Sequence, residues 1–309
     1  MNHELHNIPY LGLGIGLRRE IMTETLAHKD EIDVLEIIAE KFFPSKNPLP
    51  HQFEKFFEQF PIIPHGVDLS IGSVVPLEDE FRKDMRDLSR LVNASYYSDH
   101  FALTRSGPNL GIGHLSPLWY TKEMLEHIVR KVDDLQQYLG IPLVLENITA
   151  PFDLGEADFE EPEFIAEVHE RTGCGLLLDV TNIHINAYNR GTNALEFLKR
   201  YPMDAVVQVH LAGGEVHHDF FDDTHSQEIE GPNEGIWELL EWTARNASIK
   251  VLIIERDNNF KEDFETMILR DLRRARAIVE GARNGAASSR RARTPERNHR
   301  RTGPTVPIA

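Results

Sequence analysis

The sequence predicts an α/β fold, a (β/α)8 barrel of the TIM type, and three observations support this prediction. Short apolar runs alternate with amphipathic stretches along the chain, and they form eight strand–helix pairs without a leftover element. The strand candidates are continuously apolar, which is typical of a parallel sheet covered by helices. A length of 309 residues with 41% hydrophobic residues is enough for one large core. Eight such repeats are the number that closes a TIM barrel.

The pairs follow one another in a regular order. The strands are expected at residues 11–17, 34–39, 62–70, 96–104, 141–148, 176–180, 206–210 and 250–255. The helices are expected at residues 18–31, 52–60, 78–93, 120–139, 162–171, 193–200, 235–245 and 264–279. A doubly wound open sheet is the structural alternative, but the early run GLGIGLR lacks the third glycine of a dinucleotide-binding loop. Close packing at a barrel strand explains these glycines better.

The composition changes near the C-terminus. Residues 1–280 are expected to form the barrel domain, and residues 281–309 a tail rich in Arg, Ser, Pro and Gly. The tail lacks apolar periodicity and is therefore predicted to be disordered. Its basic charge is opposite to that of the body, and a solvated, dispensable segment is the simplest interpretation.

Charge and cysteine content exclude several classes of protein. The formal net charge of −17 should repel nucleic acid and anionic membranes, so neither is expected as a partner. The single cysteine, Cys174, excludes an intramolecular disulfide and suits a reducing compartment. The chain contains no apolar run of membrane-spanning length and no signal-peptide pattern at its N-terminus. We therefore expect a soluble, cytoplasmic protein.

Histidine and acidic residues recur where the predicted strands end. In a TIM barrel, the carboxyl ends of the strands carry the functional side chains. The candidates in chain order are His65, His100, Glu146, Asp179 with Asn182, His210, Asp223, His225 and Glu255. Asp223 and His225 lie two residues apart in a loop, so both side chains can face one point. Burying so many charges without a cation would be costly, and the sequence therefore predicts a metal site.

The donor types restrict the metal. Histidine and carboxylate ligands without cysteine suit iron, manganese or zinc. Nine donors exceed the capacity of one ion, so we expect two or three ions bridged by a carboxylate, with Glu146 or Asp179 as the candidate bridge. Glu36 and Glu40 could orient the histidine ligands. Arg18 and Arg256, near strand ends, are candidate anchors for a substrate carboxylate.

A set of motifs carries a resemblance to a known family. The motifs are GIGLRRE, DVLEIIAE, HGVDLSIG, SDHFALT, LVLENI, LLLDVTNIHINAYNRG, VHLAGG, DTHS and IIERD, and they extend over residues 11–279. Together they resemble the DUF692 family, the multinuclear non-haem iron-dependent oxidative enzymes (MNIO) of ribosomal peptide modification. The specificity lies in the combination, because no single motif would identify the family.

The resemblance implies a xylose-isomerase-like TIM barrel with two or three iron ions, held by the nine residues named above. It implies an oxidoreductase that uses mixed-valent iron and dioxygen to modify a residue, a cysteine above all, of a ribosomally synthesised precursor peptide. Many members work with a small partner protein that binds the peptide leader. The loop after residue 210 departs from the pattern, because Gly214 stands where many relatives have a histidine.

Other metal-dependent barrels remain as alternatives. The donor set is similar to that of the three-zinc endonucleases of the endonuclease IV type, which cut DNA at abasic sites and would make this chain a hydrolase. Two features count against them: the residue three positions after Asp179 is Asn182 rather than a histidine, and the body is acidic. A sugar isomerase with paired divalent metals is favoured by the fold alone. A metal-binding barrel without catalysis would need every coordination position to be filled.

Overall fold

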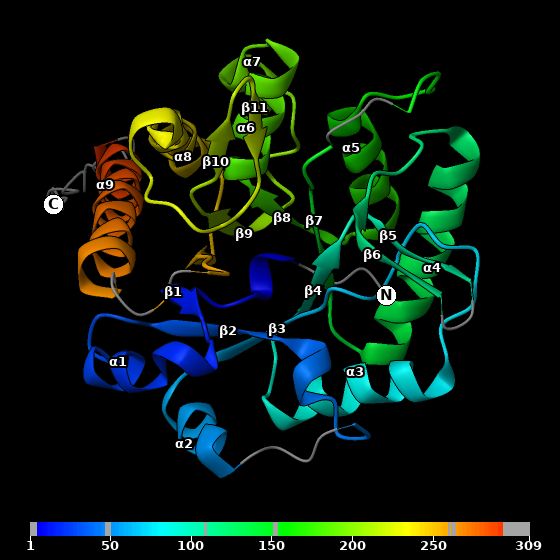
Figure 1. The fold of residues 1–309 in the computed structure, drawn as a ribbon, viewed down its shortest axis with the longest axis horizontal. Helices are drawn as coiled ribbons and strands as arrows, with labels where there is room; N and C mark the ends of the chain where they lie inside the picture. The colour runs from blue at the N-terminus through cyan, green and yellow to red at the C-terminus, as the bar shows by residue number, and fades with distance from the viewer. Residues whose placement is uncertain are drawn as a thin grey trace, which may run out of the picture.

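The computed structural model is a closed barrel of eight parallel strands surrounded by helices (Figure 1). It describes residues 5–46, 51–107, 110–150, 154–258, 260 and 264–292. The strand order around the barrel is β1-β12-β9-β8-β7-β4-β3-β2, and β2 pairs with β1 to close it. This confirms the predicted fold class.

The barrel strands coincide with the eight apolar runs. They are β1 (Gly12–Gly16), β2 (Val34–Ile38), β3 (Ile62–His65), β4 (Tyr97–His100), β7 (Leu143–Glu146), β8 (Gly175–Asp179), β9 (Val206–Leu211) and β12 (Val251–Ile254). Two antiparallel hairpins lie outside the barrel, β5 (Leu103–Gly107) with β6 (Leu110–Ser116) and β10 (Glu215–His217) with β11 (Phe220–Asp222).

The α-helices are α1 (Met22–Ala27), α2 (His51–Gln59), α3 (Asp79–Leu91), α4 (Lys122–Leu139), α5 (Glu161–Thr172), α6 (Val180–Arg190), α7 (Ala194–Leu198), α8 (Gly235–Asn246) and α9 (Arg270–Ala292). Short 3-10 turns lie at η1 (Leu5–Asn7), η2 (Arg19–Ile21), η3 (Ala39–Phe42) and η4 (Gly231–Asn233), and a π-helix, η5 (Phe264–Leu269), precedes α9. In the described part of the chain, no helix combines the length and the apolar character that crossing a membrane requires.

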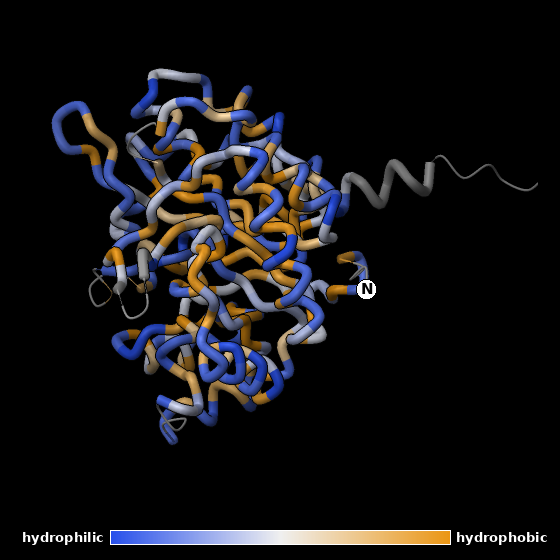
Figure 2. Tube along the Cα trace, turned by 90° about the vertical axis from the view of Figure 1, so that its right-hand side faces the viewer, coloured by the Kyte–Doolittle hydropathy of each residue, from blue (hydrophilic) through white to orange (hydrophobic). Residues whose placement is uncertain are grey.

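The apolar core has two parts. The larger cluster fills the space between the strands and the helices, and the smaller one lies inside the barrel with Val34, Ile63, Val144, Leu177 and Ile253. Figure 2 shows hydrophobic segments in the interior of the molecule and hydrophilic ones toward its surface. Side chains two residues apart on a strand point to the same face, so the next inward position on each strand lies one layer higher.

Several expectations about the elements were wrong. The third and fourth strands are shorter than the predicted 62–70 and 96–104, because the chain leaves the barrel after His65 and His100. Helix α6 was missed, since its sequence VTNIHINAYNR is rich in residues of low helix propensity; the Asp179 side chain caps it by accepting from the Asn182 amide at 2.9 Å.

The end of the last helix also differs. It was expected at residue 279, but α9 continues to Ala292 through a stretch rich in alanine and arginine, which favour helices. The predicted domain boundary at residue 280 therefore falls within a helix. Residues 293–309 lie outside the described residues, and their disorder stays a prediction.

Gly14 provides a test of the close packing inferred for the first strand. An added Cβ would lie 1.7 Å from the Val34 carbonyl oxygen, its backbone neighbour in β2. We expect Gly14→Ala to lower the free energy of unfolding by about 1–3 kcal/mol or more, because the backbone must shift. The control is Gly281→Ala in α9, where an added Cβ meets nothing and the change should stabilise the helix by up to about 1 kcal/mol. Equal midpoints of urea unfolding for Gly14→Ala and the wild type would contradict this.

Candidate metal centre

The candidate site forms the layer above the apolar filling of the barrel. Ile63, Val144, Leu177 and Ile253 are buried inside the barrel. Two residues further along the same strands come His65, Glu146, Asp179 and Glu255. The two-residue period of the strands thus directs all four functional side chains into the carboxyl-terminal mouth of the barrel.

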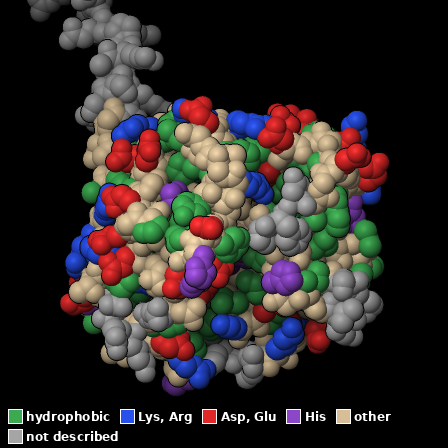
Figure 3. Space-filling view, turned by 45° about the horizontal axis from the view of Figure 1, so that its top comes forward, with side chains coloured by type: hydrophobic (Ala, Val, Ile, Leu, Met, Phe, Trp, Pro, Cys, Tyr) green, Lys and Arg blue, Asp and Glu red, His purple; other side chains and the backbone are tan. Residues whose placement is uncertain are grey.

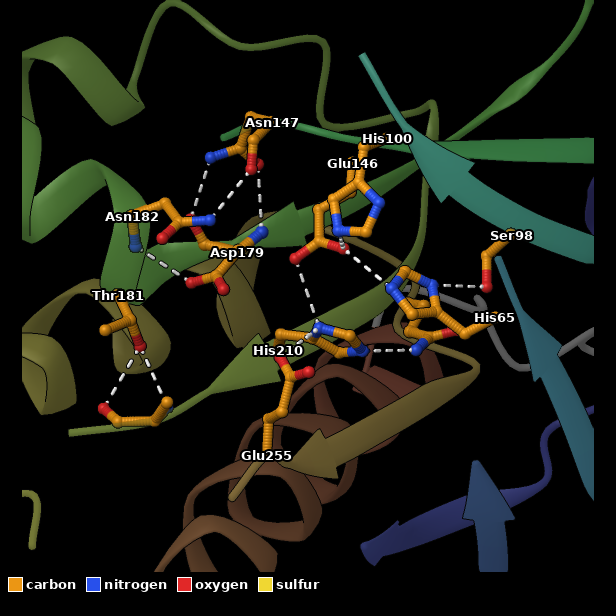
Figure 4. Close-up of polar contacts among 12 residues, drawn as sticks. His65, Ser98, His100, Glu146, Asn147, Asp179, Thr181, Asn182, His210 and Glu255 are labelled. Carbon is orange, nitrogen blue, oxygen red and sulfur yellow. Dashed lines mark hydrogen bonds and ion pairs between the residues drawn. The ribbon is translucent and has the colours of Figure 1, made fainter. Parts of the chain in front are cut away.

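The parallel register brings side chains of neighbouring strands together. His100 of β4 pairs with Glu146 of β7, and Asp179 of β8 pairs with His210 of β9. All four side chains are buried. Figure 4 shows His65, His100, Glu146 and His210 pointing toward one another at the centre of the barrel mouth.

Glu146 lies between three imidazole rings. Its Oε2 is 3.4 Å from His65 Nε2 and 3.2 Å from His100 Nε2. Its Oε1 is 3.1 Å from His210 Nδ1. The two oxygens of one carboxylate therefore face two different groups of histidines, which is the arrangement of a bridging ligand.

Glu255 links the centre to the loop that follows β9. Its Oε2 is 3.1 Å from His210 Nδ1 and 3.3 Å from His225 Nδ1. On the other side of the His225 ring, Nε2 lies 2.7 Å from Asp223 Oδ1 and 3.9 Å from Asp179 Oδ2. The predicted pair Asp223 and His225 is thus confirmed as close in space.

A small amide network fixes Asp179 and Asn182. The Asn147 side chain accepts from the Asp179 amide and donates to the Asp179 carbonyl, both at 2.9 Å. The Asn182 side chain donates to the Asn147 carbonyl at 3.0 Å, so its Oδ1 remains available as a donor atom to a cation (Figure 4). Sequence reasoning assigned no role to Asn147, because a residue that pairs with two others across strands leaves no local sequence signal.

The loop carrying Asp223 and His225 is tightly packed at its base. An added Cβ on Gly213 would lie 2.2 Å from the Gln227 carbonyl oxygen, and one on Gly214 would lie 2.6 Å from that of Asp222. The Gly214 backbone also exchanges hydrogen bonds with the Asn233 side chain, at 2.9 and 3.0 Å. A histidine in place of Gly214 would not fit this local packing.

A second layer of polar groups holds the histidine rings. The Glu36 carboxylate of β2 lies 3.1 Å from His210 Nε2 and accepts from Gln208 Nε2 at 2.5 Å. The Tyr96 hydroxyl donates to Gln208 Oε1 at 2.6 Å, and Ser98 Oγ lies 3.0 Å from His65 Nδ1. The expected orienting role of Glu36 therefore has a geometric basis, whereas Glu40 instead accepts from the backbone amides of Val67 and Asp68.

The buried carboxylates of the centre favour positive charge on the groups around them. Burial alone would lower the pKa of His210, but the carboxylates of Glu36 and Glu146 raise it well above its usual value. Burial, opposed by Glu146 and Asp99, leaves the pKa of His100 raised to about 9. Burial and the nearby Glu146 charge raise the pKa of Asp179 well above its usual value. Protons therefore bind more tightly than in water at these three side chains, and metal cations could take their place. Burial instead lowers the pKa of His65, and against the effect of burial His225 and His210 hold the pKa of Glu255 well below its usual value.

The donor atoms fit metal ions. Three groups lie close enough to share an ion: His65–His100–Glu146, Glu146–Asp179–His210–Glu255, and His225–Glu255–Asp257. Within the described residues, the buried atoms that lack a hydrogen-bond partner include Glu146 Oε2, Asp179 Oδ2, Asn182 Oδ1, Asp223 Oδ1 and His225 Nε2. Unsatisfied buried acceptors are costly, and metal coordination would compensate for them.

Arg18 and Arg256, the two candidate anchors for a substrate carboxylate, both contact other side chains of the protein. The Arg18 guanidinium is 2.9 Å from Asp257 Oδ1 and 3.8 Å from Glu255 Oε1. Arg256 is buried and its guanidinium contacts Met267 Sδ at 3.4 Å. Substrate anchoring by either arginine stays a prediction. Asp257, which sequence reasoning did not choose as a ligand, lies beside His225 and is half exposed.

Removing one shared donor tests the site. We expect Glu146→Ala and His100→Ala to lose bound metal and activity, because Glu146 faces three histidines. The affinity loss should exceed the 10- to 100-fold that is typical for outer-shell changes, about 100-fold or more. The measurement is metal per chain by elemental analysis, with circular dichroism as the test of folding. The control is Glu161→Gln, a buried glutamate at the start of α5 whose neighbours are Tyr120, Tyr201 and Arg190. Full metal content and turnover in both site variants would refute the assignment.

The fold is similar to that of sugar epimerases. A solved L-ribulose 3-epimerase aligns with a TM-score of 0.56 at 13% identity, over 92% of this chain and 99% of the epimerase. A D-tagatose 3-epimerase-like protein aligns with a TM-score of 0.52 at 16% identity, over 90% of this chain and 99% of that protein. At this level of identity, the likeness shows only the shared xylose-isomerase-like barrel.

Sequence comparisons show the family. An Anaeromyxobacter UPF0276 protein is 36% identical over 250 residues, which cover 81% of this chain and 87% of that protein. A Shewanella sediminis UPF0276 protein is 34% identical over 260 residues, covering 82% and 90%. The family model of the RiPP precursor modification enzymes MbnB/TglH/ChrH, which act on ribosomally made peptides, matches residues 12–280. The chain belongs to this family of peptide-modifying enzymes, the DUF692 (MNIO) family that its motifs resemble.

Proposed function

We propose that this chain is an iron- and dioxygen-dependent oxidoreductase that modifies a residue, a cysteine in particular, of a ribosomally synthesised precursor peptide. The observation that carries the proposal is the shared carboxylate Glu146, whose two oxygens face separate histidine groups. Family membership supplies the peptide substrate class. A leader-binding partner protein is part of the same proposal.

Nine residues would hold two or three iron ions. His65, His100 and Glu146 form the first set of donors, and Glu146, Asp179, His210 and Glu255 the second. Asp179, Asn182, Asp223 and His225 would form the third set, which differs from the His225–Glu255–Asp257 group because Glu255 is assigned to the second set. Iron would supply the redox chemistry with dioxygen. Histidine and carboxylate donors without thiolates would suit redox-active iron.

The protein's own contribution is positioning and exclusion of water. Strand ends hold the first two donor sets, and the apolar layer with Val144 and Leu177 closes the barrel beneath them. A substrate side chain must therefore enter from the carboxyl-terminal mouth. Glu36, Gln208 and Ser98 fix the imidazole orientations before substrate arrives.

A metal-dependent hydrolase is the second candidate, because the barrel and its donor set also suit hydroxide chemistry. On the face drawn in Figure 3, Lys and Arg side chains are interspersed with Asp and Glu and form no continuous basic stripe. Together with the net charge of −17, this disfavours a phosphate backbone as substrate.

Metal identity and redox state separate the two candidates. Protein produced with ample iron and purified without oxygen is expected to contain two or more irons per chain and to give a mixed-valent electron paramagnetic resonance signal. It should also consume oxygen when a cysteine-containing precursor peptide is added. The Glu146→Ala variant serves as the metal-deficient control. Zinc alone under these conditions, without oxygen consumption, would contradict the proposal and favour the hydrolase.

A further inference from the structure

We propose that Asp257 is a positioning residue that directs Nε2 of His225 toward the third set of donors, and that Arg18 holds Asp257 in place. This inference rests on the proposed function, because it concerns a metal bound by His225. It assigns Asp257 a role outside the coordination sphere.

The two nitrogens of His225 have different surroundings. Nε2 faces Asp223 Oδ1 at 2.7 Å and Asp179 Oδ2 at 3.9 Å, whereas Nδ1 faces the carboxylates of Glu255 and Asp257. Apart from these ion pairs, Asp179 Oδ2, Asp223 Oδ1 and His225 Nε2 have no hydrogen-bond partner among the described residues. Two carboxylate oxygens without a further partner therefore lie on the Nε2 side of the ring, which favours Nε2 as the metal-binding nitrogen.

Nδ1 of His225 faces groups that are already engaged. Asp257 Oδ2 lies 3.6 Å away, and the other oxygen, Oδ1, accepts from Arg18 Nη2 at 2.9 Å. Glu255 Oε2 is also near, at 3.3 Å, but the same oxygen lies 3.1 Å from His210 Nδ1, on the side of the second donor set. When Glu255 serves a metal, Asp257 is the carboxylate that can accept the Nδ1 proton, as outer-shell carboxylates commonly do for metal-bound histidines.

The backbone conformation of His225 independently supports a positioning role for Asp257. His225 is one of the non-glycine residues with a positive φ, +44°, a conformation that costs of order 1 kcal/mol or more. The Asp257 amide donates to the His225 carbonyl at 3.0 Å. Asp257 therefore holds His225 at its backbone and faces its ring, so one residue stabilises both the strained backbone and the ring orientation.

A competing assignment makes Asp257 a direct ligand, with Nδ1 of His225 and with Glu255. The half-exposed Asp257 is already paired with the mostly buried Arg18 guanidinium, which would have to compete with a cation for the same carboxylate. Two variants separate the assignments. Asp257→Asn keeps an oxygen that can accept the Nδ1 proton, whereas Asp257→Leu has none.

The experiment is anaerobic equilibrium dialysis of the full chain against a range of Fe²⁺ concentrations, with iron per chain and Mössbauer spectra as readouts. Asp257→Leu should weaken the binding of one equivalent of iron by about 10- to 100-fold and change one component of the Mössbauer spectrum. The binding and the spectrum of the remaining iron should not change. Asp257→Asn should largely rescue both readouts. The control for loss of a partly buried Arg–Asp pair is Asp271→Leu, which removes the 3.0 Å contact with Arg270 and should leave iron binding unchanged.

The outcomes are distinguishable. Equal losses in Asp257→Asn and Asp257→Leu would make Asp257 a direct anionic ligand and overturn the inference, as would unchanged binding in both variants. Loss of every equivalent in Asp257→Asn, with the fold intact, would also overturn it. Failure of the wild type itself to bind iron would refute the proposed function instead.

Discussion

The structure depends on the position of Glu146 between three histidines. A carboxylate and imidazoles at this depth cannot be hydrated, so their charges must be neutralised by one another, by protons or by cations. Three features of the surrounding structure meet this requirement. The strand register sets the spacing, the apolar layer below excludes water, and hydroxyl, amide and carboxylate groups behind the rings fix their direction.

The position of most site residues could be predicted from the sequence because a TIM barrel converts sequence order into geometry. A polar residue two positions after an apolar one that faces the barrel interior, as Glu146 follows Val144, points toward the mouth of the barrel. This rule also identifies His65 and Asp179. It needs no knowledge of distances, since closure of the barrel brings all strand ends together.

Residues that act across strands or in loops could not be assigned in this way. The link from Tyr96 through Gln208 to Glu36 joins residues more than a hundred positions apart, and no local pattern encodes such a pair. Asp257 was visible in the sequence beside Glu255, but its proximity to His225 depends on how an irregular loop folds. Helix α6 was missed because its cap, Asp179, also belongs to the site, and its polar residues resembled a loop.

The left-handed conformation of His225 has a consequence for the order in which metals enter. The first donor set lies at the ends of barrel strands, whereas the third includes a loop residue in a strained backbone conformation. Metal binding at the third position would therefore have to offset the cost of that conformation. The positions should fill in sequence, from the barrel wall outward, and the outermost ion should exchange fastest with the surrounding pool.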